Sequence, residues 1–118
     1  MKICIIGSGY VGLVSGACFS DLGNTVTCVD INREIIEKLN KGIIPIYEPG
    51  LQELVVRNLK KKRLLFTTDI SSSIKKSDII FICVGTPTKN NKADLKYVFN
   101  VTKSIKSNLN RYKIIVTK

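Results

Sequence analysis

Residues 3–12 of the chain, Ile-Cys-Ile-Ile-Gly-Ser-Gly-Tyr-Val-Gly, decide the fold. The four apolar residues predict a buried strand, and the glycines directly after it form the pattern G-x-G-x-x-G. The small and apolar residues at 11–22 then predict a helix that ends at Gly23. A strand, a glycine turn and a helix in this order are typical of the start of a dinucleotide-binding βαβ unit.

The rest of the sequence continues this alternation of strands and helices. Strands are predicted at 25–29, 64–67, 79–84 and 112–117, and polar or irregular loops at 43–50 and 85–92. Helices are predicted at about 32–39, 51–59, 69–76 and 94–109, with Asn32, Asp69 and Asp94 as N-caps. Continuous apolar strands separated by helices favour parallel pairing. The sequence therefore predicts an α/β fold with a doubly wound, mostly parallel, Rossmann-like sheet.

Length and composition indicate one packed domain over residues 1–118. The chain is 44% hydrophobic, its mean hydropathy is +0.12, and 118 residues suffice for one core. No apolar run approaches the ~20 residues that span a bilayer. The N-terminus enters a strand directly and lacks the layout of a signal peptide. We therefore expect a cytoplasmic protein that has no membrane partner.

The net charge of +10 is unevenly distributed, because residues 1–59 carry −1 and residues 60–118 carry +11. Such asymmetry sometimes accompanies nucleic-acid binding. The densest basic run, 60–63, lies between a predicted helix and strand, where cations favour the C-terminal end of the helix dipole. Only Phe66 lies nearby to stack on a base. We interpret the run as a solvated helix end and expect no nucleic-acid partner.

Neither a metal site nor a catalytic residue is predicted. Cys4, Cys18, Cys28 and Cys83 form no C-x-x-C pair, and the chain has no histidine. All four cysteines fall in apolar runs or at their ends, which is typical of packing thiols in a reducing cytoplasm. No carboxylate pair stands out as an acid and a base.

The glycine turn has the residues that a dinucleotide requires. Gly7 permits the sharp turn, Gly9 lets the backbone approach a pyrophosphate, and Gly12 allows close contact between helix and strand. The free N–H groups at the start of the helix attract the phosphates.

Two further positions bear on the choice of cofactor. Asp30 ends the second strand, 21 residues after Gly9, where a carboxylate accepts hydrogen bonds from the adenosine ribose and repels the 2′-phosphate of NADP. NAD is therefore the predicted cofactor; a plain helix cap is the alternative role for Asp30. Arg33 complicates this choice, because a nearby guanidinium can accommodate a 2′-phosphate.

Thr86 lies in the segment Val-Gly-Thr-Pro-Thr at 84–88. With strand order 3-2-1-4-5 the fourth strand lies beside the first, so this segment faces the glycine turn across the point where ligands bind. Thr86 is then placed to hydrogen-bond the ribose or phosphate of the cofactor. An ordinary turn stiffened by Pro87 is the alternative.

Four segments resemble the UDP-glucose/GDP-mannose dehydrogenase family: Gly-Ser-Gly-Tyr-Val-Gly-Leu at 7–13, Pro-Ile-Tyr-Glu-Pro-Gly-Leu at 45–51, 84–88, and Ala-Asp-Leu-Lys-Tyr at 93–97. The resemblance covers the whole chain but only the N-terminal part of a longer family member. Residues 47–51 are the part of the resemblance that is specific to this family, because generic NAD-binding domains lack this segment. The resemblance implies that NAD contacts the glycine turn, including Tyr10 and Val11, as well as Asp30 and Thr86.

The likeness is to the family members that oxidise the C6 alcohol of UDP-glucose to a carboxylate in two NAD-dependent steps. It implies a role in supplying UDP-glucuronate for polysaccharides, and a homo-oligomeric full enzyme. Relatives carry a basic residue five positions after the acid; here that position is Ile35, which leaves Arg33 as the candidate replacement.

The resemblance also implies what this chain lacks. The nucleophilic cysteine, the lysine and the asparagine of the family lie in later domains, so we expect NAD binding without turnover. Two alternatives stay open. One is a dehydrogenase for GDP-mannose or a UDP-N-acetylhexosamine, and the other is a stand-alone, non-catalytic nucleotide-binding module.

Overall fold

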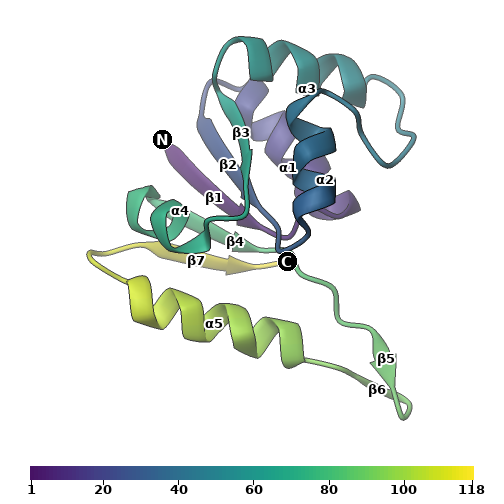
Figure 1. Ribbon diagram of the computed structural model, residues 1–118. Helices are drawn as coiled ribbons and strands as arrows, with labels where there is room; N and C mark the ends of the chain where they lie inside the picture. Colours follow the sequence, from purple (N-terminus) through teal and green to yellow (C-terminus); the bar gives the residue numbers. More distant parts are fainter.

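A five-stranded parallel sheet forms the centre of the molecule (Figure 1). The computed structural model describes all residues, 1–118. The strand order is β3-β2-β1-β4-β7, with β1 (Lys2–Ile6), β2 (Thr25–Val29), β3 (Leu64–Thr67), β4 (Ile79–Ile82) and β7 (Ile114–Thr117). Every neighbouring pair in this sheet is parallel. The predicted doubly wound α/β fold and its strand order are confirmed.

Helices cover both faces of the sheet. The helices α1 (Tyr10–Asp21), α2 (Arg33–Asn40) and α3 (Leu51–Lys60) lie on one face, and α4 (Ile70–Lys76) and α5 (Lys96–Asn108) on the other (Figure 1). Alternate residues of β1 point to opposite faces. Ile3 and Ile5 therefore join a core cluster of 12 residues, while Cys4 and Ile6 join a second cluster of 8. None of the helices has the length and apolar character needed to cross a membrane.

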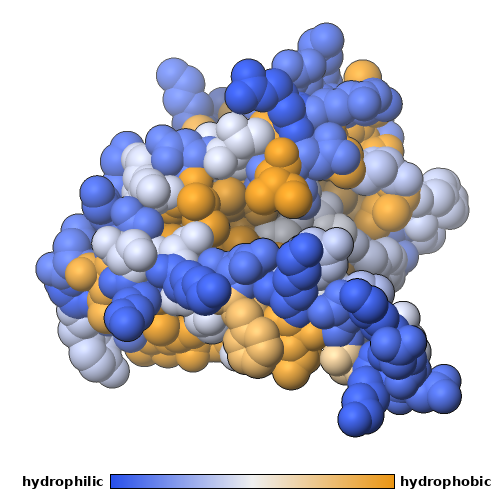
Figure 2. Space-filling view, turned by 60° about the horizontal axis from the view of Figure 1, so that its bottom comes forward, coloured by the Kyte–Doolittle hydropathy of each residue, from blue (hydrophilic) through white to orange (hydrophobic).

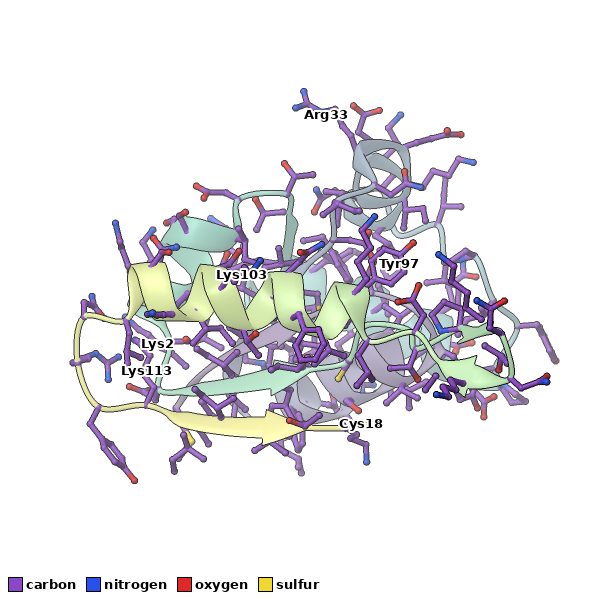
Figure 3. The ribbon with its side chains drawn as sticks, turned by 90° about the horizontal axis from the view of Figure 1, so that it is seen from below. Lys2, Cys18, Arg33, Tyr97, Lys103 and Lys113 are labelled. Atoms are coloured by element: carbon purple, nitrogen blue, oxygen red, sulfur yellow. The ribbon has the colours of Figure 1, made fainter.

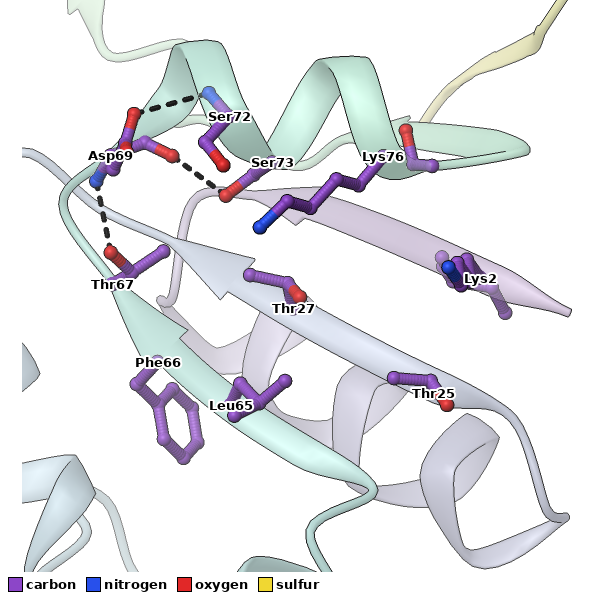
Figure 4. Close-up of a pocket in the computed structure, with 12 residues that line it drawn as sticks. Lys2, Thr25, Thr27, Leu65, Phe66, Thr67, Asp69, Ser72, Ser73 and Lys76 are labelled. Atoms are coloured by element: carbon purple, nitrogen blue, oxygen red, sulfur yellow. Dashed lines mark hydrogen bonds between the residues drawn. The ribbon is translucent and has the colours of Figure 1, made fainter.

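Two of the three predicted helix caps are confirmed. The Asn32 side chain accepts a hydrogen bond from the Ile35 N–H (3.2 Å), and that of Asp69 accepts one from the Ser72 N–H (3.1 Å; Figure 4). The prediction for Asp94 is wrong in position, because Leu95 is the N-cap of α5. Asp94 instead accepts a hydrogen bond from the Lys96 N–H (3.0 Å) and orders the turn before the helix.

Most of a short antiparallel hairpin lies in the predicted loop at 85–92; it is formed by β5 (Thr88–Lys89) and β6 (Lys92–Ala93). Asn90 and Asn91 both have positive φ, 53° and 60°, and so form a two-residue turn of the type that matches strand twist. The hairpin projects from the body as a hydrophilic arm (Figures 1 and 2). The prediction missed it because each strand has only two residues.

The last strand begins at Ile114, two residues later than predicted, because the preceding residues turn toward the C-terminus of α4. The Lys113 ammonium donates to the carbonyls of Lys75 (3.1 Å) and Ser77 (2.6 Å), although Lys113 is only 8% exposed. The Arg111 guanidinium donates to the Ser77 carbonyl (2.9 Å). Cations at these carbonyls stabilise the end of the helix.

The basic run at 60–63 is solvated only in part. Residues 60–62 are exposed, whereas the half-buried Arg63 donates two hydrogen bonds to the side-chain oxygen of Asn58 (3.2 and 3.1 Å). The Asn58 amide in turn donates to Asp21 on α1 (3.1 Å) and to the Leu54 carbonyl (2.8 Å). Asn58 is fully buried, and its hydrogen bonds join α1, α3 and the residue before β3.

We predict that Asn58→Ala lowers the free energy of unfolding by about 2 kcal/mol, because it removes a fully buried side chain together with its hydrogen bonds to Asp21, Leu54 and Arg63. The exposed Asn110 makes one hydrogen bond of 3.3 Å, and Asn110→Ala is the control, with an expected loss below about 0.5 kcal/mol. Urea unfolding of both variants measures the difference. Equal losses would contradict a structural role for the network.

Candidate functional site

Two of the three glycines in the turn after β1 are required by contacts within the chain. Gly7 has φ +106°, and a Cβ there would lie 2.6 Å from the Cys83 carbonyl oxygen at the end of β4. A Cβ on Gly12 would overlap the Gly7 carbonyl oxygen. Because of these contacts, the start of α1 packs directly against the carboxyl ends of β1 and β4. The first turn of the helix therefore lies at the carboxyl ends of the strands.

Gly9 is different, because nothing in the chain lies within 4 Å of the position of its Cβ. It is the N-cap of α1 and has a φ of −71°, which any residue can adopt. The space beside it adjoins the free N–H groups of the first helical turn, which bind anions. The open space at Gly9 thus fits the close approach of a phosphate group.

Asp30 is held against the glycine turn. Its Oδ2 accepts hydrogen bonds from the Ser8 N–H (3.0 Å) and the Ser8 hydroxyl (2.7 Å), and its Oδ1 accepts one from the Asn32 N–H (3.0 Å). Asn32, and not Asp30, caps α2, so helix capping is not the role of this carboxylate. Sequence analysis missed Ser8, because nothing in the local pattern distinguishes it from a spacer between two glycines.

The carboxyl group of Asp30 is ionised near neutral pH. Its partial burial raises the pKa, but the N–H groups of Asn32 and Ser8 and the Ser8 hydroxyl outweigh burial and hold the pKa below its ordinary value. An ionised carboxylate only accepts hydrogen bonds. It therefore suits the hydroxyl groups of a ribose and repels a phosphate at the same place.

A cavity of about 210 Å³ opens beside Asp30. Seven of its twelve lining residues are hydrophobic, and α5 contributes Tyr97, Val101 and Ser104 at helical spacing. Tyr97 lies near the start of α5 (Figure 3). An apolar cavity beside a hydrogen-bond acceptor suits the flat ring of a nucleoside. Sequence analysis did not assign these α5 residues, although their i, i+4, i+7 spacing marks one face of the helix.

The structure gathers most, but not all, of the predicted site residues. The glycine turn, Asp30 and Val84 line or adjoin the same cavity. Thr86, two residues further on, is exposed and makes no hydrogen bond within the chain. Arg33, the first residue of α2, points away from the body of the protein (Figure 3). Ile35 packs against the core and supplies no charge.

The loop at 43–50 is tied to the first residue of α1. The Tyr10 hydroxyl donates a hydrogen bond to Glu48 Oε2 (2.8 Å), which, with the negative charge of Glu48, raises the pKa of Tyr10. Ile44 and Ile46 pack against the core, whereas Tyr47 is 90% exposed. Sequence analysis missed this bond, because its partners are 38 residues apart.

A second hollow, of about 360 Å³, lies between α4 and the face of β1, β2 and β3 (Figure 4). The hydroxyl groups of Thr25 and Thr27 lie on its floor, and Lys76 of α4 reaches over it. It shares no lining residue with the cavity at Asp30, so it is not part of the candidate site.

The family model described as the NAD binding domain of the UDP-glucose/GDP-mannose dehydrogenase family matches residues 1–118. The chain belongs to this family. NAD is therefore its cofactor, and the glycine turn, the open space at Gly9 and the anionic Asp30 fit that cofactor.

Several family members are similar in sequence. The chain is 56% identical over 118 residues to the UDP-glucose 6-dehydrogenase TuaD of Bacillus subtilis. This match covers 99% of the chain and 26% of the relative. The chain is 49% identical over 120 residues to the UDP-glucose 6-dehydrogenase of Rhizobium meliloti, covering 100% of the chain and 28% of the relative. The chain thus spans little more than a quarter of the length of these relatives.

Solved structures of the family are similar in fold. A UDP-glucose dehydrogenase from Pyrobaculum islandicum superposes with a TM-score of 0.94 at 36% identity. A ternary complex of GDP-mannose dehydrogenase from Pseudomonas aeruginosa gives 0.93 at 38% identity. In each case the match covers 99% of this chain and 28% of the other. The fold is shared by enzymes named for different nucleotide sugars.

We predict that alanine at one glycine of the turn affects NAD binding, whereas alanine at another affects stability. Gly9→Ala keeps the stability within about 1 kcal/mol but weakens NAD binding roughly tenfold or more, because the new methyl group enters the open space. Gly12→Ala lowers the free energy of unfolding by at least about 2 kcal/mol, because its methyl group overlaps a carbonyl. Thermal unfolding and calorimetry with NAD measure the two effects. Unchanged NAD affinity in Gly9→Ala would contradict the placement of the phosphates.

We also predict that Glu48→Ala lowers the pKa of one tyrosine. The neutral Tyr10 hydroxyl donates to a carboxylate, and a phenolate there would face that negative charge, so Tyr10 ionises at higher pH while Glu48 is present. Ultraviolet absorbance titration follows the four tyrosines, and Tyr10→Phe identifies the contribution of Tyr10. A tyrosine titration that Glu48→Ala leaves unchanged would contradict the hydrogen bond.

Proposed function

We propose that residues 1–118 form the NAD-binding domain of an enzyme that oxidises UDP-glucose to UDP-glucuronate with two NAD. The observation that carries the proposal is the anionic carboxylate of Asp30, hydrogen-bonded to Ser8 of the glycine turn beside the open space at Gly9. The choice of UDP-glucose is supported by relatives named UDP-glucose 6-dehydrogenase at 56% and 49% identity.

Each part of the site then has a task in binding. The N–H groups at the start of α1, in the turn that contains Tyr10 and Val11, hold the pyrophosphate that Gly9 admits. Asp30 accepts hydrogen bonds from the adenosine ribose, and the apolar cavity beside it holds the adenine ring. Thr86, on the loop after β4, is a further contact to the ribose or phosphate. NAD, when bound, accepts a hydride from the sugar carbon.

We infer that the chain does not oxidise substrate by itself, because no thiol lies at the candidate cavity and burial makes three of the four thiols poor nucleophiles. Burial raises the pKa of Cys4 to about 12, and also raises the pKa values of Cys28 and Cys83. Cys18 lies on α1, and no residue of the candidate cavity is a cysteine. The thiol that would attack the aldehyde, before the second oxidation, therefore comes from other parts of the enzyme.

The proposal extends to the cellular setting. Four free cysteines, two of them buried, support a reducing cytoplasm. We also propose that the complete enzyme is a homo-oligomer and needs no nucleic acid or membrane. A GDP-mannose substrate is the second candidate, and the similarity to the GDP-mannose dehydrogenase structure at 38% identity favours it.

Calorimetry with NAD, NADP and UDP-glucose tests the proposal. We expect NAD to bind at least about tenfold more tightly than NADP, and Asp30→Ala to abolish that difference. Asp78→Ala is the matched control. Asp78 also accepts hydrogen bonds and has a lowered pKa, but it lies at the amino end of β4, away from the candidate site. NADP affinity equal to that of NAD, or formation of NADH from UDP-glucose by this chain alone, would contradict the proposal.

A further inference from the structure

Ser8 is the one residue of the glycine turn whose side chain contacts Asp30. Its hydroxyl and its N–H both donate to the same oxygen, Oδ2, at 2.7 and 3.0 Å. Ser8 is only 3% exposed, so a ligand in the cavity has little access to it. Its effect on a ligand must therefore pass through the carboxylate of Asp30.

The two hydrogen bonds from Ser8 determine how the carboxylate is oriented. The torsion that rotates an aspartate carboxyl group has broad, roughly two-fold preferences, so hydrogen bonds rather than intrinsic geometry hold its plane. An ionised carboxylate has about four lone-pair sites. Two donors from Ser8 fill those of Oδ2, and the Asn32 N–H takes one on Oδ1. The acceptor capacity left for a ligand is on Oδ1.

The Ser8 hydroxyl also removes a way to accept a phosphate. Because its single hydrogen is directed to Asp30, it has no donor left for another group. The pair Ser8–Asp30 thus offers a ligand acceptors only. A ribose hydroxyl can donate to such a pair, whereas the oxygens of a 2′-phosphate cannot, and they also meet the negative charge of Asp30.

We propose that Ser8 is a positioning residue that sets the preference for NAD over NADP by fixing the carboxylate plane of Asp30. This inference rests on the proposed function, which places the adenosine ribose at Asp30. Ser8 occupies an x position of the pattern G-x-G-x-x-G. The pattern alone does not predict that the side chain at this position affects the choice of cofactor.

Calorimetric titration of the 118-residue chain with NAD and with NADP tests the inference. Ser8→Ala is expected to weaken NAD binding about tenfold, because the carboxylate of Asp30 must then be ordered when the ligand binds, with NADP binding changed less than about twofold. Ser8→Thr, which keeps the hydroxyl, is expected to restore the NAD preference. Ser20→Ala is the matched control, because it removes another buried hydroxyl, bonded to the Ala17 carbonyl within α1, and is expected to leave the preference unchanged.

The double variant separates positioning from general stability. If Ser8 acts through Asp30, Ser8→Ala causes no further loss of NAD affinity in the Asp30→Ala background. The inference is overturned if Ser8→Ala keeps the ratio of NAD to NADP affinity while Asp30→Ala loses it, or if the two losses add. If Ser8→Ala does not fold, the ratio measured for Ser8→Cys, a weaker donor of similar shape, decides: a value equal to wild type overturns the inference.

The same titrations distinguish a failure of this inference from a failure of the proposed function. Absence of NAD binding to the wild-type chain, or NAD binding that Asp30→Ala leaves unchanged, overturns the proposed function and the inference with it. A strong effect of Asp30→Ala with none of Ser8→Ala leaves the proposed function supported and overturns only the role of Ser8.

Discussion

The contact between Gly12 and Gly7 is the constraint on which the site depends. The Gly7 carbonyl occupies the place that a side chain at position 12 would take, so α1 starts directly against the end of β1. The same turn brings Gly7 against the backbone of Cys83, which fixes the glycine turn relative to β4. Ser8 lies between these contacts and therefore reaches Asp30 at the end of β2. One short turn thus joins the ends of three strands.

The architecture could be predicted from the sequence, because most of its strands and helices have a recognisable local sequence pattern. Residues 3–6, 25–29 and 64–67 are short segments rich in apolar and β-branched residues, typical of strands in a covered parallel sheet, and Asn32 and Asp69 are polar residues at helix starts. One error came where a distant partner decides the local conformation. The strand β7 starts late because Lys113 is drawn to the carbonyls of α4, some 38 residues earlier in the chain.

The candidate site was predictable only in its backbone pattern. The spacing of the glycines and of Asp30 follows from the βαβ unit, so it is visible in one sequence. The side-chain contacts are not, because Ser8 and Asp30 are 22 residues apart and Tyr10 and Glu48 are 38 apart. Proximity in the sequence also misleads: Arg33 is three residues from Asp30, yet it starts α2 and points outward.

The three hydrogen bonds on Asp30 affect the entropy of association. They are formed within the chain itself, so the carboxylate loses its rotational freedom when the protein folds. A dinucleotide then meets a preorganised acceptor, and the ordering that binding still requires is mainly that of the ligand's own flexible pyrophosphate linkage. Differences in affinity among ligands at this site should therefore reflect how well each ligand matches the fixed acceptor, and the ordering of the ligand, more than rearrangement of the protein.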